Sequence, residues 1–329
     1  MPRIAGEFAL IERYLAPLSV PSEGAFGLKN DAAVLDIAAG DRLVATVDSL
    51  VAGRHFLPDD PPDSVARKLL RVSLSDLAAM GAEPVSYLLA ASWPLDIEEE
   101  WIAVFCQGLA ADQATFGVTL VGGDTTATPG PMTLTVTAFG RVRGTRVLDR
   151  ASLHPGDDLY VSGTVGDAFL GLRYLQGGID GLTKTARERL AERYRCPEPR
   201  VALGQALLER GLATAALDVS DGLAADLGHL LTASGVGAVL RLQDIPLSGP
   251  AEEGLALLGE PPEVVLSGGD DYELLFAAAP ERLAEIADLS RELSLPITRI
   301  GEVCVEAGLS LLDAEQNPVA LKSTGWTHF

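Results

Sequence analysis

Cysteine and histidine are scarce in this chain, whose 329 residues include 3 cysteines and 4 histidines. Cys106, Cys196 and Cys304 lie far apart and form no CxxC pair, so we expect no disulfide framework. The histidines show no HExxH or comparable spacing, which argues against a dedicated zinc site. A metal site in this chain would therefore need oxygen ligands.

Three common catalytic signatures are also missing. The sequence has no GxxxxGK[ST] loop, no GxSxG elbow and no GxGxxG fingerprint. Their absence argues against a P-loop kinase, an α/β hydrolase and a Rossmann dehydrogenase.

Basic residues are few: 25 Lys and Arg stand against 46 Asp and Glu, which gives a net charge of −21. This charge argues against nucleic acid or an anionic membrane as the main partner, and an anionic nucleotide would need metal ions and local Arg or Lys. No stretch has the length and apolarity of a signal peptide or a membrane-spanning helix. We therefore expect a soluble, cytoplasmic protein.

What the chain does have is a set of aspartates beside apolar runs or glycine pairs. Carboxylates in such places are costly unless a positive charge lies among them, and Mg²⁺ binds a few carboxylates together with water and phosphate oxygens. Any single member could instead be a helix N-cap, a turn residue or part of a surface ion pair. Their shared setting favours a magnesium site and phosphate chemistry. The six residues are Asp31, Asp48, Asp76, Asp124, Asp218 and Asp221.

Strand-like and helix-like segments alternate along the chain, which predicts an α/β protein. Its length favours two domains, 1–145 and 146–329, divided in the polar stretch Arg143–Asp157. In the first part we expect helices at Ser64–Met80, with Ser64 as N-cap, and at Glu98–Phe116. Expected strands there are Ala32–Ile37, Arg42–Val47, Val118–Val121, ending at Gly122–Asp124, and Thr133–Val142.

The second part shows three strand-to-loop junctions. A strand at Leu159–Val161 leads through Ser162–Asp167 into a helix, and this loop is either an anion cradle or a tight turn. A strand at Ala215–Val219 leads into a helix that ends near Ser234. A third loop, Ser267–Asp271, precedes a strand at Tyr272–Ala279, and the last expected strands are Ile297–Val305 and Leu309–Leu312.

Seven motifs, in order along nearly the whole chain, resemble the bacterial thiamine-monophosphate kinase family. One such motif would be weak evidence, but the ordered set is specific. The motifs are Gly6-Glu7-Phe8 with Leu10-Ile11, Val51-Ala52-Gly53-Arg54-His55-Phe56, Ser75-Asp76-Leu77-Ala78-Ala79-Met80-Gly81, Gly122-Gly123-Asp124-Thr125, Asp218-Val219-Ser220-Asp221-Gly222, Gly268-Gly269-Asp270-Asp271-Tyr272-Glu273 and Gly325-Trp326-Thr327-His328-Phe329.

The resemblance implies a two-domain α/β fold like that of aminoimidazole ribonucleotide synthetase, with N-terminal domains paired into a dimeric β-barrel. It implies transfer of the γ-phosphoryl group of ATP to thiamine monophosphate, with several Mg²⁺ ions, in a homodimer. Two alternatives stay open. The chain could be another ATP-dependent enzyme of the superfamily that includes aminoimidazole ribonucleotide synthetase, or a homologue that binds nucleotide or thiamine phosphates without turnover.

The resemblance also implies roles for single residues. No catalytic base is implied, because the acceptor is a phosphate oxygen that is already largely deprotonated at neutral pH. Local alternatives exist for three of the contacts: His55 could be satisfied within its loop, Arg150 could pair with Asp149 or nearby Glu residues, and Trp326 could anchor the tail. The metal ligands would be Asp31, Thr46, Val47, Asp48, Asp76, Asp124, Asp218 and Asp221; ATP would contact Gly122, Gly123, Arg150 and Ser220; thiamine monophosphate would contact His55, Asp270 and Trp326.

The chain departs from the family pattern at three places. Lys29-Asn30-Asp31 stands where Gly-Asp-Asp is usual, which adds a cation and removes one carboxylate. Val47 replaces a usual Ser or Thr, so only its backbone carbonyl is left as a ligand. Asp270 stands where Glu is usual, and its carboxylate is one methylene shorter.

Overall fold

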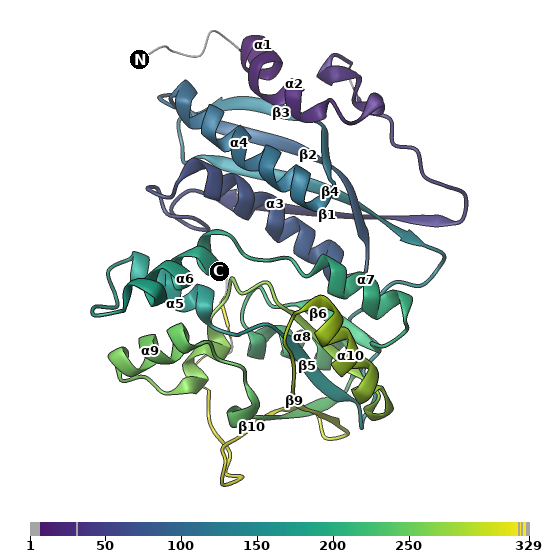
Figure 1. Cartoon of the computed structure of the whole chain (residues 1–329), viewed down its shortest axis with the longest axis vertical. Helices are drawn as coiled ribbons and strands as arrows, with labels where there is room; N and C mark the ends of the chain where they lie inside the picture. Colours follow the sequence, from purple (N-terminus) through teal and green to yellow (C-terminus); the bar gives the residue numbers. More distant parts are fainter. Residues whose placement is uncertain (1–6, 31, 322, 324, 327–329) are drawn as a thin grey trace. The chain divides into compact units, whose positions relative to one another are not determined.

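The computed structural model describes all residues except 1–6, 31, 322, 324 and 327–329. The chain divides into two compact units (Figure 1). The N-terminal unit contains Met1–Leu77 and Ala82–Arg146, and the C-terminal unit contains Ala78–Gly81 and Val147–Phe329. None of the described helices is long and apolar enough to cross a bilayer.

The N-terminal unit contains a four-stranded sheet in the order β1-β4-β2-β3. Strands β2 and β3 are parallel, and β4 runs antiparallel to both β1 and β2. Along β4, Leu134, Val136 and Ala138 are buried while the intervening residues are half-buried. This alternation is the period-2 signal that predicted the strand. The strands are β1 (Asp41–Val51), β2 (Glu83–Pro94), β3 (Thr119–Thr128) and β4 (Thr133–Arg143).

Two long helices, α3 (Pro62–Ala79) and α4 (Glu99–Phe116), cover one face of this sheet (Figure 1). They approach closely at Gly108, where a Cβ atom would lie 2.8 Å from the Cα atom of Asp63. A buried ion pair also joins them, because Arg71 Nε donates to Asp112 at 2.6 Å. The prediction of Ser64 as the N-cap was wrong. The helix begins at Pro62, a residue preorganised for the first turn, and the Ser64 hydroxyl donates to the Pro61 carbonyl.

The chain enters the sheet through short helical segments rather than through a first strand. The prediction of a strand at Ala32–Ile37 was wrong, since this segment has no ladder partner. Val34 N–H instead donates to the Gly24 carbonyl at 2.9 Å, which ties the segment to the preceding helical turn. The short segments are α1 (Glu7–Leu10), the π-helix η1 (Ile11–Leu15), α2 (Ala16–Ser19) and the 3₁₀ segment η2 (Glu23–Leu28).

The C-terminal unit contains a six-stranded sheet in the order β10-β7-β9-β5-β8-β6. Only the edge pair β10 and β7 is parallel among these described ladders. All five residues of β8 are buried, so both faces of the sheet are covered here. The strands are β5 (Asp158–Ser162), β6 (Ala215–Asp218), β7 (Gly237–Arg241), β8 (Leu274–Ala278), β9 (Ile297–Cys304) and β10 (Gly308–Leu312).

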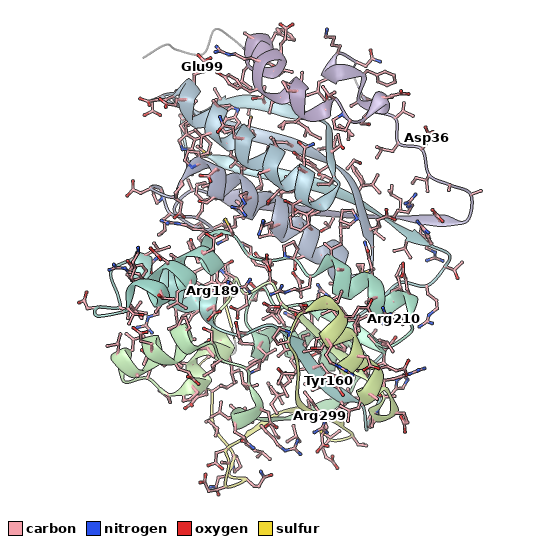
Figure 2. The ribbon with its side chains drawn as sticks, viewed as in Figure 1. Asp36, Glu99, Tyr160, Arg189, Arg210 and Arg299 are labelled. Carbon is pink, nitrogen blue, oxygen red and sulfur yellow. The ribbon has the colours of Figure 1, made fainter. Side chains whose placement is uncertain are left out.

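Neighbouring residues of β5 belong to different apolar clusters. Leu159 and Val161 pack in the larger cluster with residues of α8, while Tyr160 packs in the other cluster and stacks on Phe276 with ring centroids 5.3 Å apart. Figure 2 shows Tyr160 near Arg299, its ladder partner on β9.

The helices of this unit are α5 (Asp167–Leu175), α6 (Lys184–Arg195), α7 (Val201–Glu209), α8 (Leu223–Ser234), α9 (Gly249–Leu258) and α10 (Leu283–Leu293), and its 3₁₀ segments are η3 (Leu242–Asp244), η4 (Pro262–Ser267) and η5 (Pro280–Arg282). The predicted α/β class is confirmed.

Candidate functional site

Three of the predicted metal ligands meet between β1 and α3. Alternation along β1 gives Thr46 and Asp48 the same face, and Asp76 lies near the C-terminal end of α3. The Thr46 hydroxyl donates to Asp76 Oδ2, and the Asp76 charge acts on Asp48. The cluster of Thr46, Asp48 and Asp76 therefore offers only oxygen atoms.

The Asp48 carboxylate is under electrostatic strain. Burial, and then the neighbouring Asp76 charge, raise the pKa of Asp48 to about 6, while Ser73 opposes the shift. Asp48 Oδ2 is buried and accepts no hydrogen bond from the described residues. A buried anionic oxygen without a donor, beside a second carboxylate, fits a hard divalent cation such as Mg²⁺.

The other predicted metal ligands are spread over both units and one position outside the described residues. Among the described parts of the chain, no group of three or more His, Cys, Asp or Glu side chains converges in a way that could hold a metal ion. Asp31 lies outside the described residues, and Asp218 and Asp221 belong to the C-terminal unit. Val47 has a side chain that is 62% exposed, one residue out of phase with Thr46 and Asp48, so only its backbone could act as a ligand.

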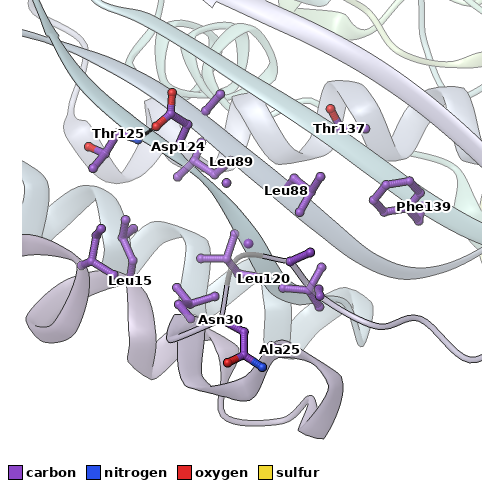
Figure 3. Close-up of a pocket in the computed structure, with 18 of the residues that line it drawn as sticks. Leu15, Ala25, Asn30, Leu88, Leu89, Leu120, Asp124, Thr125, Thr137 and Phe139 are labelled. Atoms are coloured by element: carbon purple, nitrogen blue, oxygen red, sulfur yellow. Dashed lines mark hydrogen bonds between the residues drawn. The ribbon is translucent and has the colours of Figure 1, made fainter. Parts of the chain in front are cut away.

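Gly122, Gly123 and Asp124 line a cavity of about 590 Å³ in the N-terminal unit (Figure 3). Its walls are mostly apolar, with Leu88 and Leu120 from the sheet, and Asn30 is among its few polar residues. Asp124 therefore lines the same cavity as Gly122 and Gly123, the two predicted nucleotide contacts.

The glycine pair in this cavity is part of a strand, which corrects the prediction that the strand ends there. β3 continues to Thr128 because it pairs with β2 beyond a register shift at Tyr87 and Leu88. Gly123 has a φ of +150° and would place a Cβ atom 2.6 Å from the Leu89 carbonyl carbon. A side chain at Gly123 is therefore excluded by the neighbouring strand.

One support of this strand was not foreseen from the sequence. The indole Nε1 of Trp93 donates to Thr125 Oγ1 at 2.8 Å, and the Thr125 N–H donates to Asp124 Oδ1 at 2.9 Å. Trp93 is buried against Phe105, with ring centroids 5.6 Å apart. The position of Asp124 is thus linked to the aromatic core, and only the pairing of β2 with β3 reveals this link.

His55, a predicted substrate contact, lies in the turn after β1. Its Nδ1 accepts the Val51 N–H at 3.0 Å, and its own N–H donates to the Val51 carbonyl at 3.0 Å. The neutral imidazole therefore carries its proton on Nε2.

Five predicted residues of the C-terminal unit lie at or beside the loop after β6. The Ser220 carbonyl accepts the Asp270 N–H at 2.8 Å, and the Asp221 carbonyl accepts the Trp326 N–H at 2.9 Å. Asp218 ends β6 immediately before this loop and is buried. The loop after β6, the Gly268–Asp271 loop and the segment of Trp326 therefore meet at the C-terminal end of β6.

The Asp270 segment has an unusual backbone. Asp270 has a φ of +73° and Tyr272 has a φ of +50°, both in the left-handed region. Such conformations cost about 1 to 3 kcal/mol each and persist only where the surroundings impose them. The Asp270 segment is therefore held in place by its contacts.

Glu273 supplies one such contact at the end of the segment. Its fully buried carboxylate accepts hydrogen bonds from Arg193 at 2.8 Å, from Arg200 at 2.6 Å and from the Ser162 hydroxyl at 2.6 Å. A buried carboxylate between two guanidinium groups is costly to break, because any lost partner leaves an uncompensated charge. This network was not predicted, since Arg193 and Arg200 are distant from Glu273 in the sequence.

The loop Ser162–Asp167 already holds a carboxyl group from the chain itself. Asp271 accepts the Gly166 N–H at 2.7 Å and the Ala168 N–H at 3.3 Å at the start of α5. Burial raises the pKa of Asp271 to about 8, although these bonds and Arg193 oppose the shift. The Gly166 and Ala168 N–H groups are therefore already used within the chain, which favours the tight-turn alternative for this loop.

Arg150 lies apart from the loop after β6. It is exposed, and its carbonyl accepts the hydroxyl of Ser234, at the opposite end of α8 from Asp221. Asp149 Oδ1 instead accepts from the Ala151 N–H and the Ser152 hydroxyl, each at 2.9 Å.

Comparison with known proteins covers both units. The sequence profile described as "AIR synthase related protein, N-terminal domain" matches residues 29–142, and that of the corresponding C-terminal domain matches residues 154–313. A thiamine-monophosphate kinase of Caulobacter vibrioides is 41% identical over 328 residues, which cover 98% of this chain and 90% of that protein.

Two solved structures extend the comparison. The crystal structure of a thiamine-monophosphate kinase from Stenotrophomonas maltophilia K279a matches with a TM-score of 0.80 and 41% identity, covering 86% of this chain and 89% of that chain. AaThiL complexed with AMPPCP and TMP matches with a TM-score of 0.79 and 29% identity, covering 100% of this chain and 99% of that chain. With its two AIR synthase-related domains and these full-length relatives, the chain belongs to the thiamine-monophosphate kinase family.

Proposed function

We propose that this chain transfers the γ-phosphoryl group of ATP to thiamine monophosphate and so forms thiamine diphosphate. The observation that carries the proposal is the likeness over the whole chain to AaThiL, whose structure is complexed with AMPPCP and TMP. The 41% identity to the Caulobacter vibrioides thiamine-monophosphate kinase supports the same reaction.

We propose Mg²⁺ as the cation of the Thr46, Asp48 and Asp76 cluster. The unpartnered Asp48 oxygen and the all-oxygen donor set support this choice. When bound, divalent ions would neutralise the negative charge of the phosphates, which is the main requirement of phosphoryl transfer. Asp31, Asp124, Asp218, Asp221 and the Val47 carbonyl are further candidate ligands.

The chain's own residues act in this scheme by binding and orienting. Gly122 and Gly123 present a backbone without side chains to the cavity of the N-terminal unit, where ATP would bind, and Ser220 and Arg150 are candidate contacts from the C-terminal unit. His55, Asp270 and Trp326 would contact thiamine monophosphate. The acceptor is a phosphate oxygen, so the reaction requires no residue to remove a proton.

A homodimer is proposed from the face of the sheet that α3 and α4 do not cover. On β1, Leu43 is 44% exposed and Val47 is 62% exposed, and β1 is an edge strand. Pairing with a second copy would cover these apolar side chains and protect the edge. We also place the protein in the cytoplasm, where ATP is available.

A direct assay tests the proposed reaction. The purified chain, ATP and Mg²⁺ are combined with thiamine monophosphate, with thiamine or with aminoimidazole precursors, and thiamine diphosphate and ADP are measured by chromatography. We expect equal amounts of ADP and thiamine diphosphate with thiamine monophosphate only. Turnover of an aminoimidazole precursor, or binding of thiamine monophosphate without turnover, would overturn the proposal.

A further inference from the structure

One oxygen atom of Asp226 organises the loop after β6. Asp226 Oδ2 accepts the N–H groups of Ser220 at 2.9 Å, Asp221 at 3.0 Å and Gly222 at 3.1 Å. The residue is in the first turn of α8 and is 3% exposed. Successive N–H groups of this kind could otherwise bind a phosphate, so Asp226 occupies what would be an anion nest.

The carbonyl groups of the same loop are also engaged. Val219 accepts the Tyr272 N–H at 2.7 Å, Ser220 accepts that of Asp270, and Asp221 accepts that of Trp326. The Val219 N–H in turn donates to the Glu273 carbonyl at 2.8 Å. The loop is thus the common anchor of the two segments that carry candidate substrate contacts.

Glycines permit this close assembly. A Cβ atom on Gly222 would lie 2.9 Å from the carbonyl carbon of Ser267, and one on Gly269 would lie 2.5 Å from the Ser220 oxygen. One on Gly325 would lie 2.7 Å from the Asp221 oxygen. Each of the three segments therefore contributes a glycine where it meets another, and the backbone positions are tightly coupled.

Because each N–H from Val219 to Gly222 donates to an acceptor within the chain, the backbone of this loop has no donor left for a phosphate ligand. We propose that Asp226 is a positioning residue for substrate binding, which fixes the loop so that Asp221, Asp270 and Trp326 lie together. This inference rests on the proposed function for its kinetic consequence. Its structural part, the coupling of the three segments through Asp226, can be measured separately.

The test uses Asp226→Asn, which keeps the size of the side chain and removes its charge. Asp157→Asn is the matched control, because Asp157 is also a buried acceptor of this unit, with Thr214 Oγ1 at 2.8 Å and His154 N–H at 3.1 Å. Asp157 precedes β5, which runs in the same direction as β6. It therefore lies at the opposite end of the strands from the loop after β6. Loss of stability alone should affect both variants.

Hydrogen exchange of the full-length chain, measured by mass spectrometry, gives the first readout. In Asp226→Asn we expect faster exchange in peptides that contain Asp270, Tyr272 and Trp326, and unchanged exchange there in Asp157→Asn. The second readout is kinetic. We expect kcat/KM for thiamine monophosphate to fall about tenfold in Asp226→Asn, mainly through KM, because Asn replaces one of the two carboxyl oxygens with an NH₂ group and is the weaker acceptor for the three N–H groups.

Unchanged exchange of the Asp270 and Trp326 segments in Asp226→Asn would overturn the inference, whatever the kinetics. So would equal losses of kcat/KM in the two variants at equal thermal stability. If the wild-type chain shows no turnover of thiamine monophosphate, the proposed function fails, and the exchange experiment still decides whether Asp226 positions the three segments.

Discussion

The carboxylates of Asp48 and Asp76 repel each other within the N-terminal unit, and this repulsion adds to the effect of burial on Asp48. Its pKa is raised to about 6 by burial and by Asp76, and its Oδ2 atom has no donor among the described residues. The repulsion between these two carboxylates destabilises the folded chain, and a bound cation would relieve it.

Asp48→Asn should stabilise the metal-free chain at high pH. Since folding raises the pKa of Asp48, the folded chain binds this proton more tightly than the unfolded chain. The contribution of Asp48 to stability is therefore full below the ordinary value near 3.8 and is lost as pH rises through about 6. At pH 8 the variant should gain at most about 3 kcal/mol in the free energy of unfolding, and the gain should vanish near pH 4.

Denaturant unfolding in EDTA at pH 8 and pH 4 measures this difference. Asp96→Asn is the control, because Asp96 is an exposed residue in the turn after β2. A variant at position 48 that is less stable than the wild type at pH 8 would show that Asp48 is a structural partner rather than a strained ligand.

Magnesium should stabilise the wild-type chain through the same cluster. A ligand that binds only the folded chain raises the free energy of unfolding with its concentration, by about 2.7 kcal/mol at one hundred times its dissociation constant. We expect Tm to rise with Mg²⁺ in the wild type and in Asp96→Asn, and to rise less in Asp48→Asn and Asp76→Asn. Both cluster variants should also lose most kinase activity. Wild-type turnover in either one would remove the cluster from the metal site.

Gly123→Ala should damage the N-terminal unit as well as its cavity. The methyl group would lie 2.6 Å from the Leu89 carbonyl carbon, at a φ of +150°. Together, backbone strain and overpacking should cost roughly 2 to 5 kcal/mol. Gly130→Ala is the control in the β3 to β4 turn, where the nearest atom to a Cβ is 3.5 Å away. Equal urea midpoints for the two variants would contradict this account.

Leu43→Glu should disrupt the proposed homodimer. It places a charge on the uncovered face of β1, beside the exposed Val47 side chain, and burying that charge against a second copy is unfavourable. Leu95→Glu is the control, since Leu95 is 76% exposed in the turn after β2. Sedimentation at micromolar concentration should show a dimer for the wild type and the control, and a monomer for Leu43→Glu. A monomeric wild type would end the dimer proposal.

Local sequence patterns predicted the elements that depend on local physics. The alternation along β4 predicted that strand, and the helix expected at Glu98–Phe116 is α4, which ends before the left-handed Gly117. The strand expected at Ala32–Ile37 failed because a strand also needs a partner, and β3 extended past its glycine pair because β2 continues beside it. These outcomes depend on pairing between distant segments, which no local pattern contains.

The candidate site shows the same division. Asp48 could be selected from its place beside an apolar run and Asp270 from its motif, and their functional roles remain predictions. Asp226 and the Glu273 network could not be selected, because their importance comes from what they contact after folding. The spacing of Asp226, four residues after Gly222 at a helix start, is typical of an ordinary acidic first turn.

Asp270 gives the sharpest test of the substrate contact. Its backbone is held by the hydrogen bond to the Ser220 carbonyl and has a φ of +73°. A change of side chain therefore alters how far the carboxylate extends more than where the backbone lies. Asp270→Glu restores the usual family residue and should lower KM for thiamine monophosphate while leaving KM for ATP unchanged. Asp270→Asn tolerates the left-handed backbone and removes the charge, so it should raise that KM by an amount equivalent to about 1.5 to 3 kcal/mol. If both variants keep wild-type kinetics, Asp270 is a turn residue and the contact belongs elsewhere. If Asp270→Glu raises KM instead, the loop has already moved inward to compensate for the shorter side chain.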